Sequence, residues 1–391
     1  MEIISKTKDL ESFCKVASEK DFVTIDTEFI REKTYYADLC LIQMAFIAKN
    51  NETDAILIDP LSSQISLSPL FDLMQNNKVL KVFHAARQDL EIFFSLSGFI
   101  PNPFFDTQVA AMVCGFGDQI SYEKLVKEFS GVTLDKSNRF SNWASRPLSE
   151  EQCTYALGDV TFLREVYLGL KALLQSNGRE AWVREEIERL ADTTNYFTDP
   201  GQAWKKIKMR GGSKIFLALI KDLAEFRERE AQDRNLIRRR IFRDDALLEI
   251  AAKKPTNFGD INKLRFLPKD SQKNWIGKKI LEIVANVDPS TAPIIESKST
   301  TKDDKSNQTL IELLKVLLTH CSEISGVAQK IIATSSDLRE IAGEEIPNSR
   351  TLSGWRKEIF GSNALKLKNG EIGLSVKGTD VTIVNTNKLK I

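Results

Sequence analysis

Residues 22–29 read FVTIDTEF, a short apolar run that ends with two acids, Asp26 and Glu28. A run of this kind, bounded by polar residues, predicts a β-strand. Side chains alternate between the two faces of a strand, so these two carboxylates are expected to converge on one spot. Like charges in a half-buried site repel each other, and a divalent cation with oxygen ligands removes that repulsion. The alternative is a strand end whose acids reach solvent or form salt bridges.

The surrounding sequence predicts a domain of mixed strands and helices. Further short apolar runs predict strands at residues 39–46, 55–59 and 78–84. The loop before residue 39 has a length that fits an antiparallel hairpin. Helical patterns that each end at a glycine follow at residues 86–98, 121–131 and 149–178. We therefore expect one α/β domain over residues 1–195.

The rest of the chain predicts helical modules. Helical patterns fill residues 212–290. The segment 291–307 is rich in Ser, Thr, Pro and charged residues and is predicted to be a linker. A second helical module is expected over 308–391. The sequence SDLREIAG at 336–343 is similar to DALLEIAA at 245–252, which hints at a repeated domain. The last residues alternate as strands do, without an evident place in either module.

Charge and cysteine content narrow the classes of function. Residues 1–200 carry 20 Lys and Arg against 30 Asp and Glu, whereas residues 201–391 carry 35 against 24. A basic half can hold a polyanion through phosphate contacts, although a Lys-rich helical surface has the same composition. The five cysteines include no Cys-x-x-Cys pair and the chain has two histidines, so the usual zinc site is not expected. Any metal is expected on carboxylates.

Nothing in the sequence predicts a membrane protein or a secreted one. No apolar run reaches the roughly 18 residues that span a bilayer. The first residues lack the basic-then-apolar order of a signal peptide. We therefore expect a cytoplasmic protein with no membrane partner, and a monomer, because no long apolar stripe stands out.

Two further acids stand in helical contexts. Asp89 lies just inside the helix predicted after the strand at 78–84, and Asp159 follows Tyr155 by four residues. Residues i and i+4 share one face of a helix, so the Tyr155 hydroxyl and the Asp159 carboxylate are expected to address the same site. Taken singly, Tyr155 is more typical of a core tyrosine and Asp89 of a surface acid.

Taken together, these residues resemble a known pattern. The order Asp-x-Glu, Asp, Tyr-x-x-x-Asp resembles the DEDD superfamily of 3′→5′ exonucleases, in its tyrosine-bearing branch. The segments LCLIQMA, VFHAARQDLEIF, FFDTQVAA and RFSNWASRPLSEEQCTYALGDV are similar to the ribonuclease D family, and residues 212–290 resemble its HRDC domain. The resemblance implies a ribonuclease H-like α/β exonuclease domain with a mixed sheet, followed by two all-α HRDC-like domains, the second divergent.

The resemblance also implies the catalytic roles. Asp26, Glu28, Asp89 and Asp159 would hold two divalent metal ions, Mg²⁺ or Mn²⁺, as in two-metal hydrolysis at phosphorus. Tyr155 would orient the attacking water, because a tyrosine with a pKa of ~10 is a poor general base at neutral pH.

Three more residues are candidates for substrate binding. Phe29 lies beside the acids and could stack on the terminal base, as aromatic side chains do on single strands; core packing is the alternative. Gln43 on the second strand either faces substrate or is a core amide. His84 either touches substrate or makes a structural hydrogen bond to its loop.

The function that follows is a metal-dependent 3′→5′ exoribonuclease that releases 5′-mononucleotides, with tRNA precursors as the family's typical RNA substrate and tRNA 3′-end maturation as its process. A DNA 3′→5′ exonuclease and a catalytically inactive RNA-binding protein are the alternatives. The first helical module is expected to hold RNA by charge. The second has 13 basic and 11 acidic residues over 301–391, which favours an architectural role.

Overall fold

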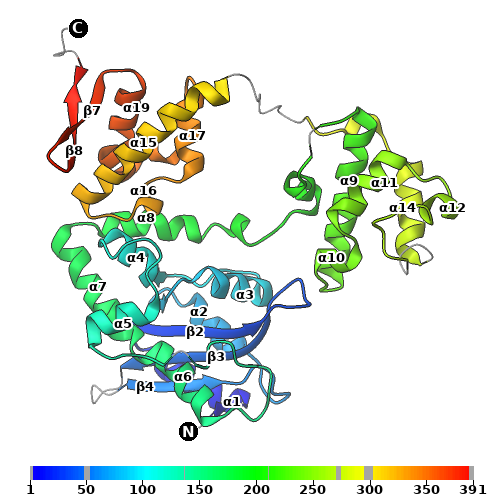
Figure 1. The fold of residues 1–391 in the computed structure, drawn as a ribbon. Helices are drawn as coiled ribbons and strands as arrows, with labels where there is room; N and C mark the ends of the chain where they lie inside the picture. Colours follow the sequence, from blue (N-terminus) through cyan, green and yellow to red (C-terminus); the bar gives the residue numbers. More distant parts are fainter. Residues whose placement is uncertain are drawn as a thin grey trace.

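A computed structural model describes residues 3–47, 53–135, 137–209, 211–269, 274–294 and 303–386. The chain forms an α/β domain, from which one helical module (α9 to α14) and a second one (α15 to α19) extend (Figure 1). The predicted order of an α/β domain followed by helical modules is confirmed.

The α/β domain is built on a six-stranded mixed sheet with the order β1-β4-β3-β2-β5-β6. Its strands are β1 (Ile3–Ile4), β2 (Phe22–Ile30), β3 (Asp38–Ile47), β4 (Thr53–Ile58), β5 (Leu80–Phe83) and β6 (Phe104–Asp106). The predicted hairpin is confirmed, because β2 and β3 pair antiparallel, whereas β5 runs parallel to both β2 and β6. The sequence did not predict β1 and β6, since strands of two or three residues carry too little alternation to be recognised.

Helices cover both faces of this sheet. They are α1 (Thr7–Ala17), α2 (Ser68–Gln75), α3 (Arg87–Ser97), α4 (Thr107–Val113), α5 (Tyr122–Ser130), α6 (Glu150–Thr161), α7 (Leu163–Asn177) and α8 (Glu180–Leu190), followed by the 3-10 helices η1 (Thr193–Asn195) and η2 (Pro200–Lys206). One core joins apolar residues of the sheet to α1, α2 and α3. A smaller cluster on the opposite face joins residues of β3 and β4 to α6.

The single helix predicted over 149–178 is in fact two helices, α6 and α7, which meet at Phe162. The hydroxyl of Thr24 on β2 donates to the carbonyl oxygen of Val160 (2.8 Å), and the hydroxyl of Thr161 bonds a carbonyl one turn earlier (2.7 Å). Side chains that compete for carbonyls loosen the ladder of a helix and bend it. The break therefore results from contacts with β2 that the helical periodicity does not reveal.

The first helical module has a core of its own. It contains α9 (Lys214–Asp233), α10 (Arg238–Ile241), α11 (Asp244–Lys253), α12 (Phe258–Ile261), α14 (Trp275–Ala285) and the 3-10 helix η3 (Pro289–Thr291). It meets the α/β domain at the loop between β2 and β3, where the Tyr35 hydroxyl donates to Glu228 (2.5 Å). Arg238 pairs with the same carboxylate, which is 1% exposed.

The second module contains helices and, unlike the expected all-α domain, a terminal hairpin of strands. Its elements are α15 (Asp303–Ser325), α16 (Gln329–Ile332), α17 (Ser335–Gly343), η4 (Arg350–Leu352), α18 (Gly354–Arg356), the π-helical turn η5 (Lys357–Gly361), α19 (Ser362–Lys368), β7 (Ile372–Lys377) and β8 (Asp380–Asn385). The first helix begins at Asp303, within the segment predicted as a linker. The alternating residues at the end of the chain form β7 and β8, which pair antiparallel and pack in part on the module's core.

The two helical modules begin with the same succession of elements. A helix of 20 or 23 residues is followed by one of four residues and one of ten or nine, which are α9, α10, α11 in the first module and α15, α16, α17 in the second. The similar octapeptides of the sequence lie in α11 and α17. This order supports a duplicated unit.

The second module shares one continuous core with α4, α7 and α8 of the α/β domain, and Figure 1 shows it seated against α4 and α8. At the contact the rings of Trp182 and Trp355 stack with centroids 4.9 Å apart. Next to them the fully buried Arg356 forms ion pairs with Glu185 (3.2 Å) and Glu186. The α/β domain and the second module are thus packed as one body.

No helix among the described residues is long and apolar enough to span a membrane.

Candidate active site

Strand β2 places two of the predicted acids side by side. Asp26 pairs with Gln43 and Glu28 with Leu41 in the antiparallel ladder, so both acids lie on the sheet face that α6 covers. The ladder is irregular directly after Glu28. One carboxylate oxygen each of Asp26, Glu28 and Asp159 lies within 4.8 Å of the other two.

Helix α6 supplies Asp159 and Tyr155 from the same face, as the spacing predicted. The helix begins with a capping box, in which the Ser149 hydroxyl accepts from the Gln152 backbone N–H and the Gln152 side chain accepts from that of Ser149. The Tyr155 hydroxyl lies close enough to the Asp159 carboxylate to lower the pKa of that acid. The hydrogen bond from the Thr24 hydroxyl on β2 to the carbonyl oxygen of Val160 holds this turn against the sheet.

Asp89 lies on α3 beside the group of three acids. Its Oδ1 accepts a hydrogen bond from the Thr27 hydroxyl (2.5 Å), and the side chain is buried. The start of α3 is fixed by Asp106, whose carboxylate accepts from the backbone N–H groups of Ala85 (3.0 Å) and Ala86 (2.9 Å). Asp106 lay in a segment that supported the family resemblance, but its role in setting this turn becomes visible only in the structure.

Burial and neighbouring charges raise the pKa values of the four acids. Burial raises the pKa of Asp26 to about 7. Burial and the neighbouring charges of Asp26, Asp159 and Asp89 raise the pKa of Glu28 to about 10. Burial and the charge of Asp26 also raise the pKa values of Asp89 and Asp159. Without a cation, this site therefore favours protonated acids.

These residues fit divalent cations that prefer oxygen ligands. Three carboxylates converge, and their mutual repulsion is the kind that a bound cation relieves. Gln43 adds a second observation. It is 0% exposed, it lies directly opposite Asp26, and neither its amide oxygen nor its nitrogen has a hydrogen-bond partner among the described residues. Such an orphaned amide beside the acids fits a site that is completed by a bound group.

The other predicted substrate residues are divided between the site and the core. His84 lines the pocket that contains Asp26 and Asp159, and its Nδ1 lies 3.0 Å from the Thr107 hydroxyl oxygen. Burial lowers the pKa of His84. Phe29 is half-buried and packs against the core on the far side of the sheet from α6. Both expected structural alternatives are thus present, and the substrate roles of these residues stay predictions.

Sequence reasoning missed two charged residues near the acids and an exposed aromatic residue next to one of them. Glu123 at the start of α5 raises the pKa of Asp159 by its charge, and Arg139 lowers the pKa of the same group. Phe140, next to Arg139, is 92% exposed, with the arginine guanidinium 5.5 Å from the centre of its ring. Only the RFSNWASRP segment pointed to this loop, and a loop has no periodicity that predicts its path.

The loop that carries Arg139 is tied to the sheet at its end. The Arg146 guanidinium forms two hydrogen bonds to Asp59 (2.7 and 2.8 Å) and one to the carbonyl oxygen of Cys40 (2.6 Å). Bidentate pairing of this type fixes geometry as well as charge. Arg146 therefore supports the position of the loop without contacting the acids.

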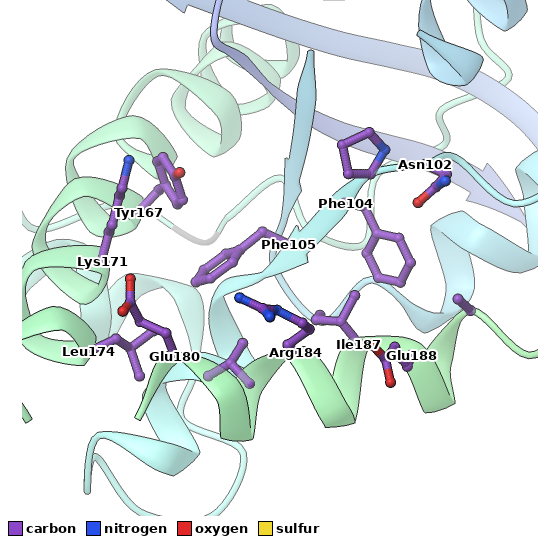
Figure 2. Close-up of a pocket in the computed structure, with 13 residues that line it drawn as sticks. Asn102, Phe104, Phe105, Tyr167, Lys171, Leu174, Glu180, Arg184, Ile187 and Glu188 are labelled. Atoms are coloured by element: carbon purple, nitrogen blue, oxygen red, sulfur yellow. The ribbon is translucent and has the colours of Figure 1, made fainter. Parts of the chain in front are cut away.

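The pocket at the acids needs to be distinguished from a larger, more apolar one. The pocket at the acids has a volume of about 350 Å³ and is lined by Asp26, His84, Arg139, Tyr155 and Asp159 among others. A more apolar pocket of about 460 Å³ lies beside the edge strand β6, where Phe104 and Phe105 face α8, with Tyr167 and Lys171 on α7 (Figure 2). None of the four predicted acids lines this second pocket, so we place the chemistry in the first.

Comparison with known proteins identifies the family. A family model described as 3'-5' exonuclease matches residues 1–175, and a model of the HRDC domain matches residues 216–284. The chain is 48% identical over 386 residues to ribonuclease D of Jannaschia sp. (strain CCS1), which covers 97% of this chain and 98% of the relative. It is 44% identical over 393 residues to ribonuclease D of Bartonella henselae, and this alignment covers 100% of this chain and 94% of the relative.

A solved structure agrees with these relatives. The crystal structure of Escherichia coli ribonuclease D, an exoribonuclease involved in structured RNA processing, matches with a TM-score of 0.81 and 27% identity, over 94% of this chain and 98% of that chain. The predicted fold, a ribonuclease H-like exonuclease domain followed by an HRDC domain, is confirmed. The prediction of an exoribonuclease is confirmed in preference to the DNA exonuclease and the inactive binding protein. The chain belongs to the ribonuclease D family, and it is a hydrolytic 3′→5′ exoribonuclease whose substrate is RNA and whose family uses divalent metal.

Proposed function

We propose that Asp26, Glu28, Asp89 and Asp159 together hold two divalent ions, Mg²⁺ or Mn²⁺, and that this site removes 5′-mononucleotides from RNA 3′ ends. The convergence of three of these carboxylates within 4.8 Å is the observation that carries the proposal. Asp89 joins them by turning from the Thr27 hydroxyl. Bound divalent ions supply Lewis-acid stabilisation of charge on phosphate oxygens and acidify water.

Tyr155 acts in this proposal as a hydrogen-bond donor that orients the attacking water. Burial and the charges of Asp159 and Glu28 raise its pKa, so the hydroxyl keeps its proton at neutral pH. A group that keeps its proton is a poor general base but a dependable donor. The ring of Trp143 packs beside the Tyr155 ring, with centroids 6.0 Å apart.

The residues proposed for substrate binding act around the terminal nucleotide. His84 lines the pocket and contacts the RNA backbone as a neutral imidazole, which its lowered pKa favours. Gln43 contributes its free amide beside Asp26. Phe29 stacks on the terminal base only if it turns from the core against which it packs, so it is the weakest of the three.

We further propose that the substrates are structured RNAs with a free 3′ tail, among them tRNA precursors, and that the enzyme is a cytoplasmic monomer. The similarity to an Escherichia coli enzyme of structured RNA processing supports the choice of RNA. The duplicated order of helices in the two modules supports the second HRDC-like domain predicted over 308–391, with its first helix beginning at Asp303. The five free cysteines fit a reducing compartment.

The test uses an RNA hairpin labelled at its 5′ end, with a single-stranded 3′ tail and a DNA of matched sequence. We expect a ladder that shortens from the 3′ end with Mg²⁺ or Mn²⁺, is lost with EDTA and is absent for DNA. Asp26→Asn is expected to abolish the ladder and to leave binding of the same RNA in EDTA largely intact. The matched control is Asp38→Asn, an exposed acid on the neighbouring strand β3. Full activity of Asp26→Asn contradicts the metal assignment.

A further inference from the structure

The pocket at the acids continues into a larger pocket at the junction with the second helical module. This junction groove has a volume of about 520 Å³ and shares Ala85, Gln108 and Gln119 with the pocket at the acids. Its walls come from α3, α4 and α8 of the α/β domain and from α16 and η4 of the second module. An extended ligand in the active site can therefore run directly into this groove.

Cations from both domains line the junction groove. Arg87 and Arg189 come from the α/β domain, and Lys330 and Arg350 come from the second module. Four positive side chains in one concave surface concentrate a field that attracts a polyanion. Lysine and arginine at such positions bind nucleic acid through phosphate oxygens, independently of sequence.

The two acids in the groove, Asp106 and Glu186, are already engaged. The Asp106 carboxylate accepts hydrogen bonds from the backbone N–H groups of the β5–α3 turn and of the first turn of α4. Glu186 is paired with the buried Arg356. The described lining of the groove thus carries four cations against two acids.

The cations of the groove retain donors for a ligand. The Nη2 of Arg189 pairs with Glu185 (2.9 Å), whereas its Nη1, which is shielded from solvent, has no hydrogen-bond partner among the described residues. The Lys330 ammonium donates to the uncharged side-chain oxygen of Gln119 (3.1 Å). The Arg350 guanidinium donates through Nε to the Asp337 carboxylate (3.3 Å) and through Nη2 to the carbonyl oxygen of Lys330 (3.3 Å), whereas its Nη1 has no hydrogen-bond partner among the described residues. The N–H groups that Lys330 and Arg350 leave unused are donors of the kind that phosphate oxygens accept from.

The pocket at the acids has another neighbour, whose charge is opposite. A pocket that shares Glu123, Tyr155 and Asp159 with it is lined in addition by three further acids, Asp135, Glu150 and Glu151. No lysine or arginine is among the described residues that line it. A phosphate backbone is repelled on this side and attracted on the side of the junction groove.

We propose that the junction groove binds the phosphates of the single-stranded 3′ tail, upstream of the nucleotide being removed, and that the second helical module binds RNA directly through Lys330 and Arg350. This role differs from the architectural one that the nearly neutral composition of the module suggested. It rests on the exoribonuclease activity and gives the substrate a direction: the tail enters between the α/β domain and the second module.

The test measures RNA binding in EDTA, with hairpins that carry a tail of two or of about twelve nucleotides. For Lys330→Gln combined with Arg350→Gln, we expect roughly a tenfold loss of affinity for the long tail and a clearly smaller loss for the short one. The slope of log K against log salt should fall by about 1.4, because each phosphate contact to a single strand contributes about 0.7.

Lys366→Gln is the matched control. Lys366 is an exposed lysine on α19 of the same module, outside the groove. Arg350→Lys, which keeps the charge, tests whether a loss comes from unfolding around Asp337, and thermal unfolding is compared for all variants. Equal losses for both tail lengths, or an equal loss in Lys366→Gln, overturn the proposal. Hydrolysis of a dinucleotide is measured separately, so failure of the metal site is distinguished from failure of the groove.

Discussion

Replacement of Asp26 by asparagine is expected to make the metal-free enzyme more stable while it abolishes hydrolysis. Burial raises the pKa of this acid from 3.8 to about 7. The folded state therefore binds the proton more tightly than the unfolded state. Between these two pKa values the free energy of unfolding falls as the pH rises, and above the folded pKa the full penalty applies.

The magnitude follows from the difference between the two pKa values. Each unit corresponds to about 1.4 kcal/mol, so an ionised Asp26 costs the metal-free protein roughly 4 kcal/mol. Asp26 keeps some contact with solvent, which makes this value an upper bound. Asparagine has nearly the same volume and no charge. The stability gain of Asp26→Asn should therefore grow from near zero at about pH 4 to its full value above about pH 7.

The assay is urea unfolding in EDTA at several pH values, for the wild type, Asp26→Asn and the control Asp38→Asn. Taking the difference between variant and wild type at each pH removes the titration of all other groups. Addition of Mg²⁺ at pH 8 should stabilise the wild type more than Asp26→Asn, because binding to the folded state alone raises stability. If the gain of Asp26→Asn does not change with pH, or if Asp38→Asn gains as much, the electrostatic argument for this site is refuted.

Three further substitutions test other parts of the structure. Tyr155→Phe should reduce the hydrolysis rate by roughly 10²-fold or more, because the hydrogen-bond donor is lost. The pH–rate profile should keep its shape, since the hydroxyl does not titrate in the working range, and a shifted profile contradicts the orienting role. Phe140→Ala should weaken the binding of tailed RNA by about 1–3 kcal/mol, because the exposed ring can stack on a base. The measurement is RNA affinity in EDTA, with a duplex that has no tail as the control ligand. Arg356→Met should destabilise the protein by about 3–5 kcal/mol, because it leaves Glu186 buried without its partner. Thermal unfolding measures the loss of stability, and an unchanged midpoint contradicts the packing described for the second module.

The sequence was sufficient to predict the parts of the site that local periodicity controls. The alternation of a strand brought Asp26 and Glu28 to one face, and the spacing of a helix brought Tyr155 to Asp159. The convergence of β2 with α6 followed from the family resemblance rather than from any local pattern. The side chain of Asp89, which turns to Thr27, was not predictable, because it depends on which hydroxyl lies within reach after folding.

What the sequence did not predict depends on contacts between segments far apart in the chain. Arg139 is near the acids because its loop is tied to Asp59 through Arg146, and no periodicity records that tie. The basic groove was hidden because net charge averages over a whole module, whereas Lys330 and Arg350 act from one wall of it. Composition therefore understated what the second module contributes.

The continuous core between the second module and helices α4, α7 and α8 has a consequence for biosynthesis. The ribosome completes α8 at Leu190, but the apolar partners of that surface arrive with residues 311–367, after the whole first module has been made. At about 5–20 residues per second, the nascent chain waits on the order of ten seconds with this face uncovered. Chaperones have that interval in which to engage it. The face of α4, α7 and α8 that meets the second module is fully covered only after residue 367 has been made.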